Sequence, residues 1–179
     1  MAIIQKKYIG LLGGSFDPAH KGHLGISKIA IKKFKLKKIY WVITKKNPFK
    51  NKTFYSLDER IEYAKKITKA QKKIKTIYVD NIIKSSRIID VINYFIKKKK
   101  IKNIFFIIGS DNLMRFHKWK SWKKIVKLVK LVVFSRKGYD KKGMKSTVVK
   151  NFKNKIIFIK NKPIAFSSTQ LKKQEKLKI

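Results

Sequence analysis

The 179-residue chain contains no cysteine and only nine acidic residues. Without cysteine it can form neither disulfide bonds nor a thiolate nucleophile, which excludes a disulfide scaffold and thiol chemistry. No uncharged run approaches the roughly 20 apolar residues of a membrane-spanning helix. The N-terminal residues also lack the charged-then-apolar order of a signal peptide. We therefore expect a cytoplasmic protein that does not associate with membranes.

The shortage of acids leaves a large positive charge. Lysine and arginine number 48, which gives a formal net charge of +39. Such a charge is typical of proteins that bind nucleic acid or an anionic surface. The lysines, however, are spread along the chain among isoleucines, a pattern that codon bias in an AT-rich genome would also produce. We expect nucleic acid to bind only non-specifically, and phosphorylated substrates to be attracted in a salt-dependent way.

Short apolar runs alternate with helical patterns along the chain. The runs are continuous, as in strands covered on both faces, and the chain length suits one domain with a full core. This order predicts a single α/β domain over residues 1–179, doubly wound and Rossmann-like, with a mainly parallel sheet of about five to six strands. Ligands of such sheets bind at the carboxyl ends of the strands. The expected strands are residues 8–12, 39–43, 76–79, 104–108, 131–134 and 156–159, and the expected helices are 20–35, 56–72, 88–97, 111–116 with 121–127, and 141–151.

A glycine-rich turn separates the first expected strand from the first expected helix. Gly13 and Gly14 follow the apolar run, and Ser15 and Phe16 continue toward the helix. Because glycine has no side chain, the backbone can bend sharply here and a ligand can approach closely. The next helix would direct its free N–H groups and positive dipole end at that ligand, which favours an anion.

Two of the three histidines lie in this turn. The spacing of His20 and His23 is about one helical turn, so both imidazoles are expected on the same side of the helix start. Two imidazoles beside a glycine turn indicate a phosphate site. The alternative is a turn that serves packing alone, since glycine turns between strands and helices are common.

Residues 13–18 (GGSFDP) and 20–23 (HKGH) resemble the signature of the nucleotidyltransferase superfamily that carries the HxGH motif. Residues 166–172 (FSSTQLK) resemble that superfamily's ISSTxIR segment, with Lys172 in place of arginine. This replacement keeps the charge but loses the bidentate fork. The chain ends at Ile179, where the family usually continues, so we expect a short or truncated C-terminal helical part.

Segments in the middle of the chain resemble one particular family within this superfamily. Residues 107–113, Trp119 and residues 135–139 are similar to the corresponding segments of bacterial nicotinate-nucleotide adenylyltransferases. The matching segments follow in the same order over nearly the whole chain. The resemblance implies that ATP is bound by Gly13, Gly14, Ser15, Phe16, His20, His23, Ser167, Ser168, Thr169 and Lys172.

Lys50 completes the catalytic set that the resemblance implies, with His20 and His23. It follows Pro48 in a loop after the second expected strand and resembles a family lysine that would hold the triphosphate. In so basic a chain, a solvated lysine is the alternative. Beyond this loop, Ser56 and Glu59 predict a capped helix start, and Arg60 is expected to serve structure rather than catalysis.

The mononucleotide is expected at Ser86, Asp111, Trp119 and Arg136. By resemblance Trp119 stacks on the pyridine ring, which suits an aromatic side chain. Asp111 would bond a ribose hydroxyl, or else be a helix-start acid, and Arg136 would bind a phosphate or carboxylate. A family threonine that contacts the pyridine nucleotide falls on Ile88, which leaves open how that nucleotide is held.

The resemblance implies adenylyl transfer from ATP to nicotinate mononucleotide, with pyrophosphate as the second product, in NAD biosynthesis. Mg²⁺ is expected with ATP, held mostly by phosphates and water, with no protein side chain as a ligand. The alternatives are nicotinamide mononucleotide or phosphopantetheine as the acceptor, and a polyanion-binding protein that has lost catalysis. The sequence leaves homo-oligomer formation open.

Overall fold

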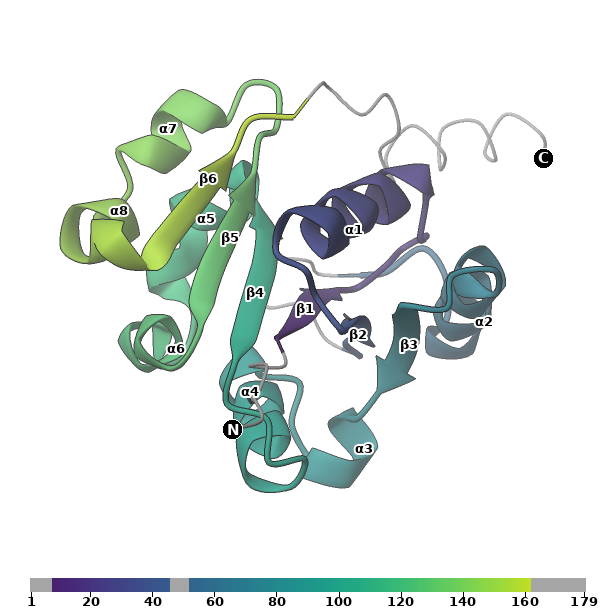
Figure 1. Cartoon of the computed structure of the whole chain (residues 1–179). Coiled ribbons are helices and arrows are strands. Elements are labelled where there is room, and N and C mark those ends of the chain that lie inside the picture. Colours follow the sequence, from purple (N-terminus) through teal and green to yellow (C-terminus); the bar gives the residue numbers. More distant parts are fainter. Residues whose placement is uncertain (1–7, 46–51, 162–179) are drawn as a thin grey trace, which may run out of the picture.

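The computed structural model describes residues 8–45 and 52–161. In these ranges six strands form one sheet in which every neighbouring pair is parallel, in the order β3-β2-β1-β4-β5-β6 (Figure 1). The predicted α/β class and its parallel, doubly wound sheet are confirmed. The strands are β1 (Ile9–Gly14), β2 (Lys38–Ile43), β3 (Ile74–Tyr78), β4 (Ile104–Gly109), β5 (Lys130–Phe134) and β6 (Ile156–Ile159).

Helices cover both faces of the sheet, because neighbouring strand residues point to opposite sides and both sides are apolar. Leu11 packs with buried residues of α4, α5, α6 and α8, whereas Leu12 packs with those of α1 and α2. The helices are α1 (Lys21–Lys33), α2 (Leu57–Thr68), α3 (Asp80–Ile83), α4 (Ile88–Lys97), α5 (Ser110–Arg115), α6 (Trp122–Leu128), α7 (Asp140–Met144) and α8 (Thr147–Phe152), with 3-10 turns at Phe116–Lys118 and Lys153–Lys155.

The sheet changes direction of winding between β1 and β4. The chain moves outward from β1 through β2 to β3 at one edge, then returns through α3 and α4 to place β4 on the other side of β1. The connection after β1 leads to β2 on one side, and the connection after β4 leads to β5 on the other side. Where the connections of two neighbouring strands diverge in this way, a crevice opens at the carboxyl ends of the two strands. Gly14 ends β1 and Gly109 ends β4, so both border this point.

Several predicted boundaries were wrong. The helix expected over residues 141–151 is two short helices, because Ser146 is extended and begins α8. Helix α2 ends at Thr68 rather than at residue 72, and Thr68 Oγ1 bonds back to the carbonyl of Ala64 at 2.8 Å. Helix α3 was not predicted. Within the described ranges, each helix is too short or too polar to span a bilayer.

Candidate functional site

The bend after β1 lies beyond the glycines. Strand β1 continues through Gly13 and Gly14, which pair with β2, and neither has a left-handed backbone. The positive φ of 47° is at Phe16 instead. The Phe16 ring is 3% exposed and stacks on Trp41 at a centroid distance of 5.1 Å. The expectation of a bend at the glycines was therefore wrong, and their contribution is a strand end without side chains.

The two imidazoles are adjacent at the start of α1. His20 is the N-cap residue, and its Nδ1 accepts a hydrogen bond from the N–H of Gly22 at 3.1 Å. His23 Nδ1 accepts one from the backbone N–H of His20 at 3.2 Å. The ring centroids are 3.9 Å apart. The histidines thus form a reciprocal capping box that fixes both rings.

These hydrogen bonds determine the tautomer. In a neutral imidazole whose Nδ1 accepts, the proton is on Nε2, which is then a donor. Burial lowers the pKa of His20 to about 4, and the positive charge of Arg136 acts in the same direction. Near neutral pH, His20 in the free protein is therefore an uncharged Nε2–H donor.

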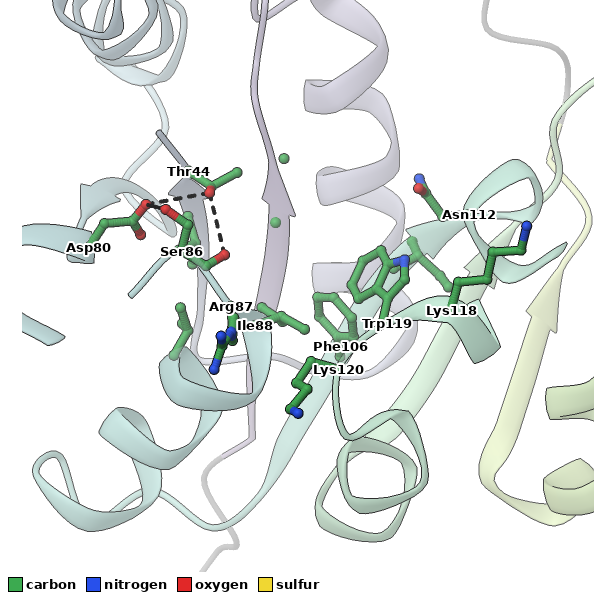
Figure 2. A pocket seen from close by; sticks show the side chains of 15 residues that line it. Thr44, Asp80, Ser86, Arg87, Ile88, Phe106, Asn112, Lys118, Trp119 and Lys120 are labelled. Atoms are coloured by element: carbon green, nitrogen blue, oxygen red, sulfur yellow. Dashed lines mark hydrogen bonds between the residues drawn. The ribbon is translucent and has the colours of Figure 1, made fainter. Parts of the chain in front are cut away.

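A cavity of about 500 Å³ opens beside the glycines (Figure 2). It lies between the ends of β1, β2 and β4 and the start of α4, where the sheet topology places the crevice. Four of the residues expected to bind ATP or the mononucleotide line it, namely Gly13, Gly14, Ser86 and Trp119. The remaining lining residues are Val42, Thr44, Asp80, Arg87, Ile88, Val91, Phe106, Ile108, Asn112, Lys118 and Lys120.

One wall of this cavity is aromatic and aliphatic. The Trp119 indole stacks on Phe116 at 5.0 Å and lies 6.0 Å from the Phe106 ring. A methyl group added to Gly13 would lie 3.6 Å from both Ile88 Cδ1 and Phe106 Cε2, so the missing side chain of Gly13 contributes to the space. A flat heterocycle fits such a wall.

The opposite wall is polar and is organised by Asp80. This carboxylate is 7% exposed, and its Oδ2 accepts hydrogen bonds from Ser86 Oγ at 2.6 Å and from Thr44 Oγ1 at 3.4 Å (Figure 2). The same oxygen accepts from the N–H of Lys45 at 2.9 Å. Sequence reasoning missed Asp80. The available signal was its position two residues after the end of β3, at the carboxyl edge of the sheet.

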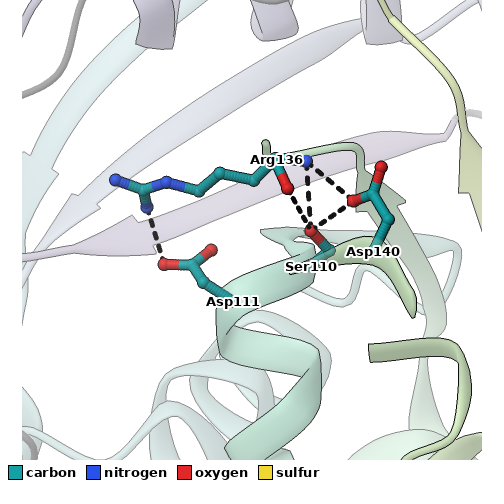
Figure 3. A network of polar contacts seen from close by, with 4 residues as sticks. All are labelled: Ser110, Asp111, Arg136 and Asp140. Atoms are coloured by element: carbon teal, nitrogen blue, oxygen red, sulfur yellow. Dashed lines mark hydrogen bonds and ion pairs between the residues drawn. The ribbon is translucent and has the colours of Figure 1, made fainter. Parts of the chain in front are cut away.

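Asp111 and Arg136 lie together but do not line the cavity. Arg136 Nη1 donates to Asp111 Oδ2 at 2.6 Å (Figure 3). The backbone N–H of Arg136 donates to Asp140 Oδ1 at 2.9 Å and to Ser110 Oγ at 3.0 Å. Asp140 also accepts from Ser110 Oγ at 2.6 Å and from the hydroxyl of Ser135.

Burial would raise the pKa of Asp140, but hydrogen bonds from Ser110 and Ser135 and from the N–H of Arg136 hold it below its ordinary value. An ionised Asp140 therefore fixes the turn after β5. That turn places the Arg136 guanidinium close enough to His20 to influence the pKa of the imidazole. Sequence reasoning missed Asp140, which no motif marks.

Arg60 has the structural role expected of it. It is 2% exposed, and its Nη1 donates to the carbonyls of Ser15 at 2.8 Å and Thr44 at 2.9 Å, while its Nε donates to Ser56 at 3.2 Å. Burial lowers the pKa of the Arg60 guanidinium, and the Asp17 carboxylate opposes that effect. One buried cation thus joins the histidine turn, the end of β2 and the start of α2.

Five residues expected at the site lie outside the described residues. They are Lys50 in the loop after β2 and Ser167, Ser168, Thr169 and Lys172 in the C-terminal segment. The side chains of Ser15 and Phe16 are described and buried, so these two residues present mainly backbone to a ligand.

Known proteins match over most of this chain. A family model described as cytidylyltransferase-like matches residues 11–174. A probable nicotinate-nucleotide adenylyltransferase of Pelagibacter ubique (strain HTCC1062) is 49% identical over 170 residues, which cover 94% of each chain. One of Bradyrhizobium sp. (strain ORS 278) is 36% identical over 113 residues, 63% of this chain and 58% of that protein.

A solved structure shares the fold. The nicotinic acid mononucleotide adenylyltransferase of Plasmodium falciparum, complexed with NaAD, matches with a TM-score of 0.71 at 18% sequence identity. The match covers 93% of this chain and 83% of that one.

Proposed function

The chain belongs to the cytidylyltransferase-like family, and on that premise we propose that it transfers the adenylyl group of ATP to nicotinate mononucleotide. The products are nicotinate adenine dinucleotide, an intermediate of NAD biosynthesis, and pyrophosphate. The likeness to the Pelagibacter protein of that name, over 94% of both chains, supports this activity. The observation that carries it is the fixed pair of imidazoles at the start of α1. The pair does not line the cavity, but it follows closely in the chain after Gly13 and Gly14, which do.

The reaction is an in-line displacement at phosphorus. A phosphate oxygen of the mononucleotide forms a bond to the α-phosphorus of ATP, and the bond from that phosphorus to the oxygen bridging to the β-phosphate breaks. The nucleophile is already an anion, so it needs no general base. The protein therefore contributes positioning and charge stabilisation.

His20 is the proposed donor to the reacting phosphate. Its Nε2–H would donate to an α-phosphate oxygen and gain strength as charge develops there. His23, fixed in the same capping box, would orient neighbouring phosphate oxygens. Gly13 and Gly14 would admit the nucleotide against bare backbone, and Ser15 with Phe16 would contribute main-chain groups.

The β- and γ-phosphates are assigned by resemblance. Lys50 would bind them from the loop after β2, and Lys172 from the C-terminal segment. Ser167, Ser168 and Thr169 would add hydroxyl and N–H donors, as at a helix start. Together these groups would stabilise pyrophosphate as it leaves.

The mononucleotide is proposed to place its pyridine ring in the cavity and to extend beyond it toward Asp111 and Arg136. Its pyridine ring would stack on the exposed part of Trp119, and Ser86 would contribute to the polar wall. Asp111 would bond a ribose hydroxyl and Arg136 a phosphate, which requires Arg136 to exchange part of its contact with Asp111 for the substrate. The 52% exposure of the Arg136 side chain makes it available for this exchange.

Mg²⁺ would accompany ATP. Within the described residues there is no group of three or more His, Cys, Asp or Glu side chains positioned to hold a metal ion. Near His20 the charged groups are the Arg136 guanidinium and the Asp111 carboxylate that it binds. That carboxylate is paired with a cation, so phosphate oxygens and water would supply the coordination. The ion would neutralise charge on the triphosphate.

The test is product identification. The purified protein, ATP and Mg²⁺ are incubated separately with nicotinate mononucleotide, nicotinamide mononucleotide and phosphopantetheine, and pyrophosphate and the nucleotide product are measured. Turnover fastest with nicotinate mononucleotide supports the proposal. Turnover only with another acceptor, or tight salt-sensitive binding of duplex DNA without any turnover, would refute it.

A further inference from the structure

Cationic side chains outnumber acidic ones around the cavity. Three cationic side chains line it, from Arg87, Lys118 and Lys120, against a single carboxylate, that of Asp80 (Figure 2). Within the described part of the chain, no ion pair joins any of these cations to an acid. A cavity with this excess favours an anionic ligand group.

Asp80 does not balance the cations. Its Oδ2 accepts three hydrogen bonds, from Ser86, Lys45 and Thr44, and its Oδ1 is buried away from solvent. Oδ2 therefore holds the polar wall together, and Oδ1 accepts no hydrogen bond from the cationic side chains that line the cavity. The positive charges of Arg87, Lys118 and Lys120 remain available to a ligand in the cavity.

From this distribution we propose that Arg87 recognises the carboxylate on the pyridine ring, and so makes the cavity selective for nicotinate over nicotinamide mononucleotide. The inference rests on the proposed function and deepens it. Arg87 is the N-cap residue of α4 and is exposed, so its guanidinium can rearrange toward a ligand without leaving the core. An arginine fork can form two parallel hydrogen bonds to a carboxylate, which a lysine ammonium cannot.

The position of Arg87 fits this role. In Figure 2, Arg87 and Trp119 are on opposite sides of Ile88 and Phe106. A ring that stacks on Trp119 would present its far edge, with the carboxylate, toward the start of α4. Ile88 contributes only hydrocarbon to the cavity, so the neighbouring arginine is the side chain at this helix start that can bind an anion.

The amide of nicotinamide would gain much less. It is neutral, so it loses the Coulomb attraction and the charge-assisted pair of hydrogen bonds. Removal of the guanidinium should consequently affect the two mononucleotides unequally. A purely structural role of Arg87 would affect them equally.

The experiment measures kcat/KM for both mononucleotides at saturating ATP. The variants are Arg87→Gln, Arg87→Lys and, as a matched control, Arg115→Gln, which removes an exposed arginine that does not line the cavity. For Arg87→Gln we expect kcat/KM to fall on the order of 10- to 100-fold with nicotinate mononucleotide and less than about threefold with nicotinamide mononucleotide. Arg87→Lys should be intermediate, and Arg115→Gln unchanged.

Equal losses for both mononucleotides, or unchanged use of nicotinate mononucleotide by Arg87→Gln, would overturn the role of Arg87 and leave the proposed function intact. A wild-type protein that turns over neither mononucleotide would overturn the proposed function itself, and this inference with it. The two failures are distinguishable because the second appears before any substitution is made.

Discussion

Replacement of Arg60 by methionine tests how the site is held together. The change removes the hydrogen bonds to the carbonyls of Ser15, Thr44 and Ser56 and leaves the Asp17 carboxylate without its nearby cation. Loss of one partner from a buried charged network costs about 3–5 kcal/mol of unfolding free energy. For a chain of this size that corresponds to a fall of roughly 10 °C in Tm.

The assay is thermal and urea unfolding followed by circular dichroism, with Arg115→Met as the control for a generic loss of arginine. Arg60→Lys should give an intermediate loss, because a single ammonium cannot reach all three carbonyls in the geometry of the fork. Below Tm, Arg60→Met should also raise KM for both substrates, since Ser15 precedes the histidine turn and Thr44 lines the cavity. An Arg60→Met protein within about 1 kcal/mol of wild type would refute this reasoning.

Three further outcomes are expected. Unfolded His20 takes up a proton as the pH falls below its ordinary pKa of 6.5, whereas folded His20 stays neutral down to about pH 4. The free energy of unfolding of the wild-type protein should therefore decrease as the pH is lowered from 6.5 to about 4. His20→Asn retains an N-cap side chain, so its free energy of unfolding, measured by urea titration at each pH, should decrease less over this range than that of the wild type. An equal decrease in both proteins would contradict the lowered pKa of His20. Gly13→Ala places a methyl group in ordinary contact with Ile88 and Phe106, so Tm should hardly change. The methyl group takes up cavity space, so KM for the mononucleotide should rise about tenfold. An unchanged KM would exclude this cavity as the mononucleotide site. Asp140→Asn weakens the acceptor for the Arg136 N–H and should raise KM for ATP or mononucleotide more than it lowers Tm, whereas an effect on Tm alone would assign Asp140 to stability only.

Local pattern was enough to predict the architecture. The apolar runs are continuous because both faces of each strand are buried, and all six expected strands are present near their expected positions. The capped start of α2 was visible for a similar reason, since Ser56 and Glu59 bond to each other's backbone N–H over a span of three residues. The spacing of His20 and His23 was likewise enough to predict that their rings lie together.

The remainder depends on contacts between distant segments. Arg60 reaches Ser15 across 45 residues, and Ser110 reaches Asp140 across 30. No local period or motif encodes such pairs. The bend at Phe16 was missed for a related reason: its ring is held by Trp41 of the neighbouring strand, whereas sequence alone favours glycine for a positive φ.

The most direct test of the account is the rate of pyrophosphate release from ATP and nicotinate mononucleotide by His20→Asn. Asparagine can cap α1, so Tm should stay close to that of wild type, but it cannot replace the Nε2–H donor to the α-phosphate. We predict a fall in kcat on the order of 100- to 1000-fold, the usual cost of one lost donor to a reacting oxyanion. A wild-type rate in this folded variant would contradict adenylyl transfer at the paired imidazoles.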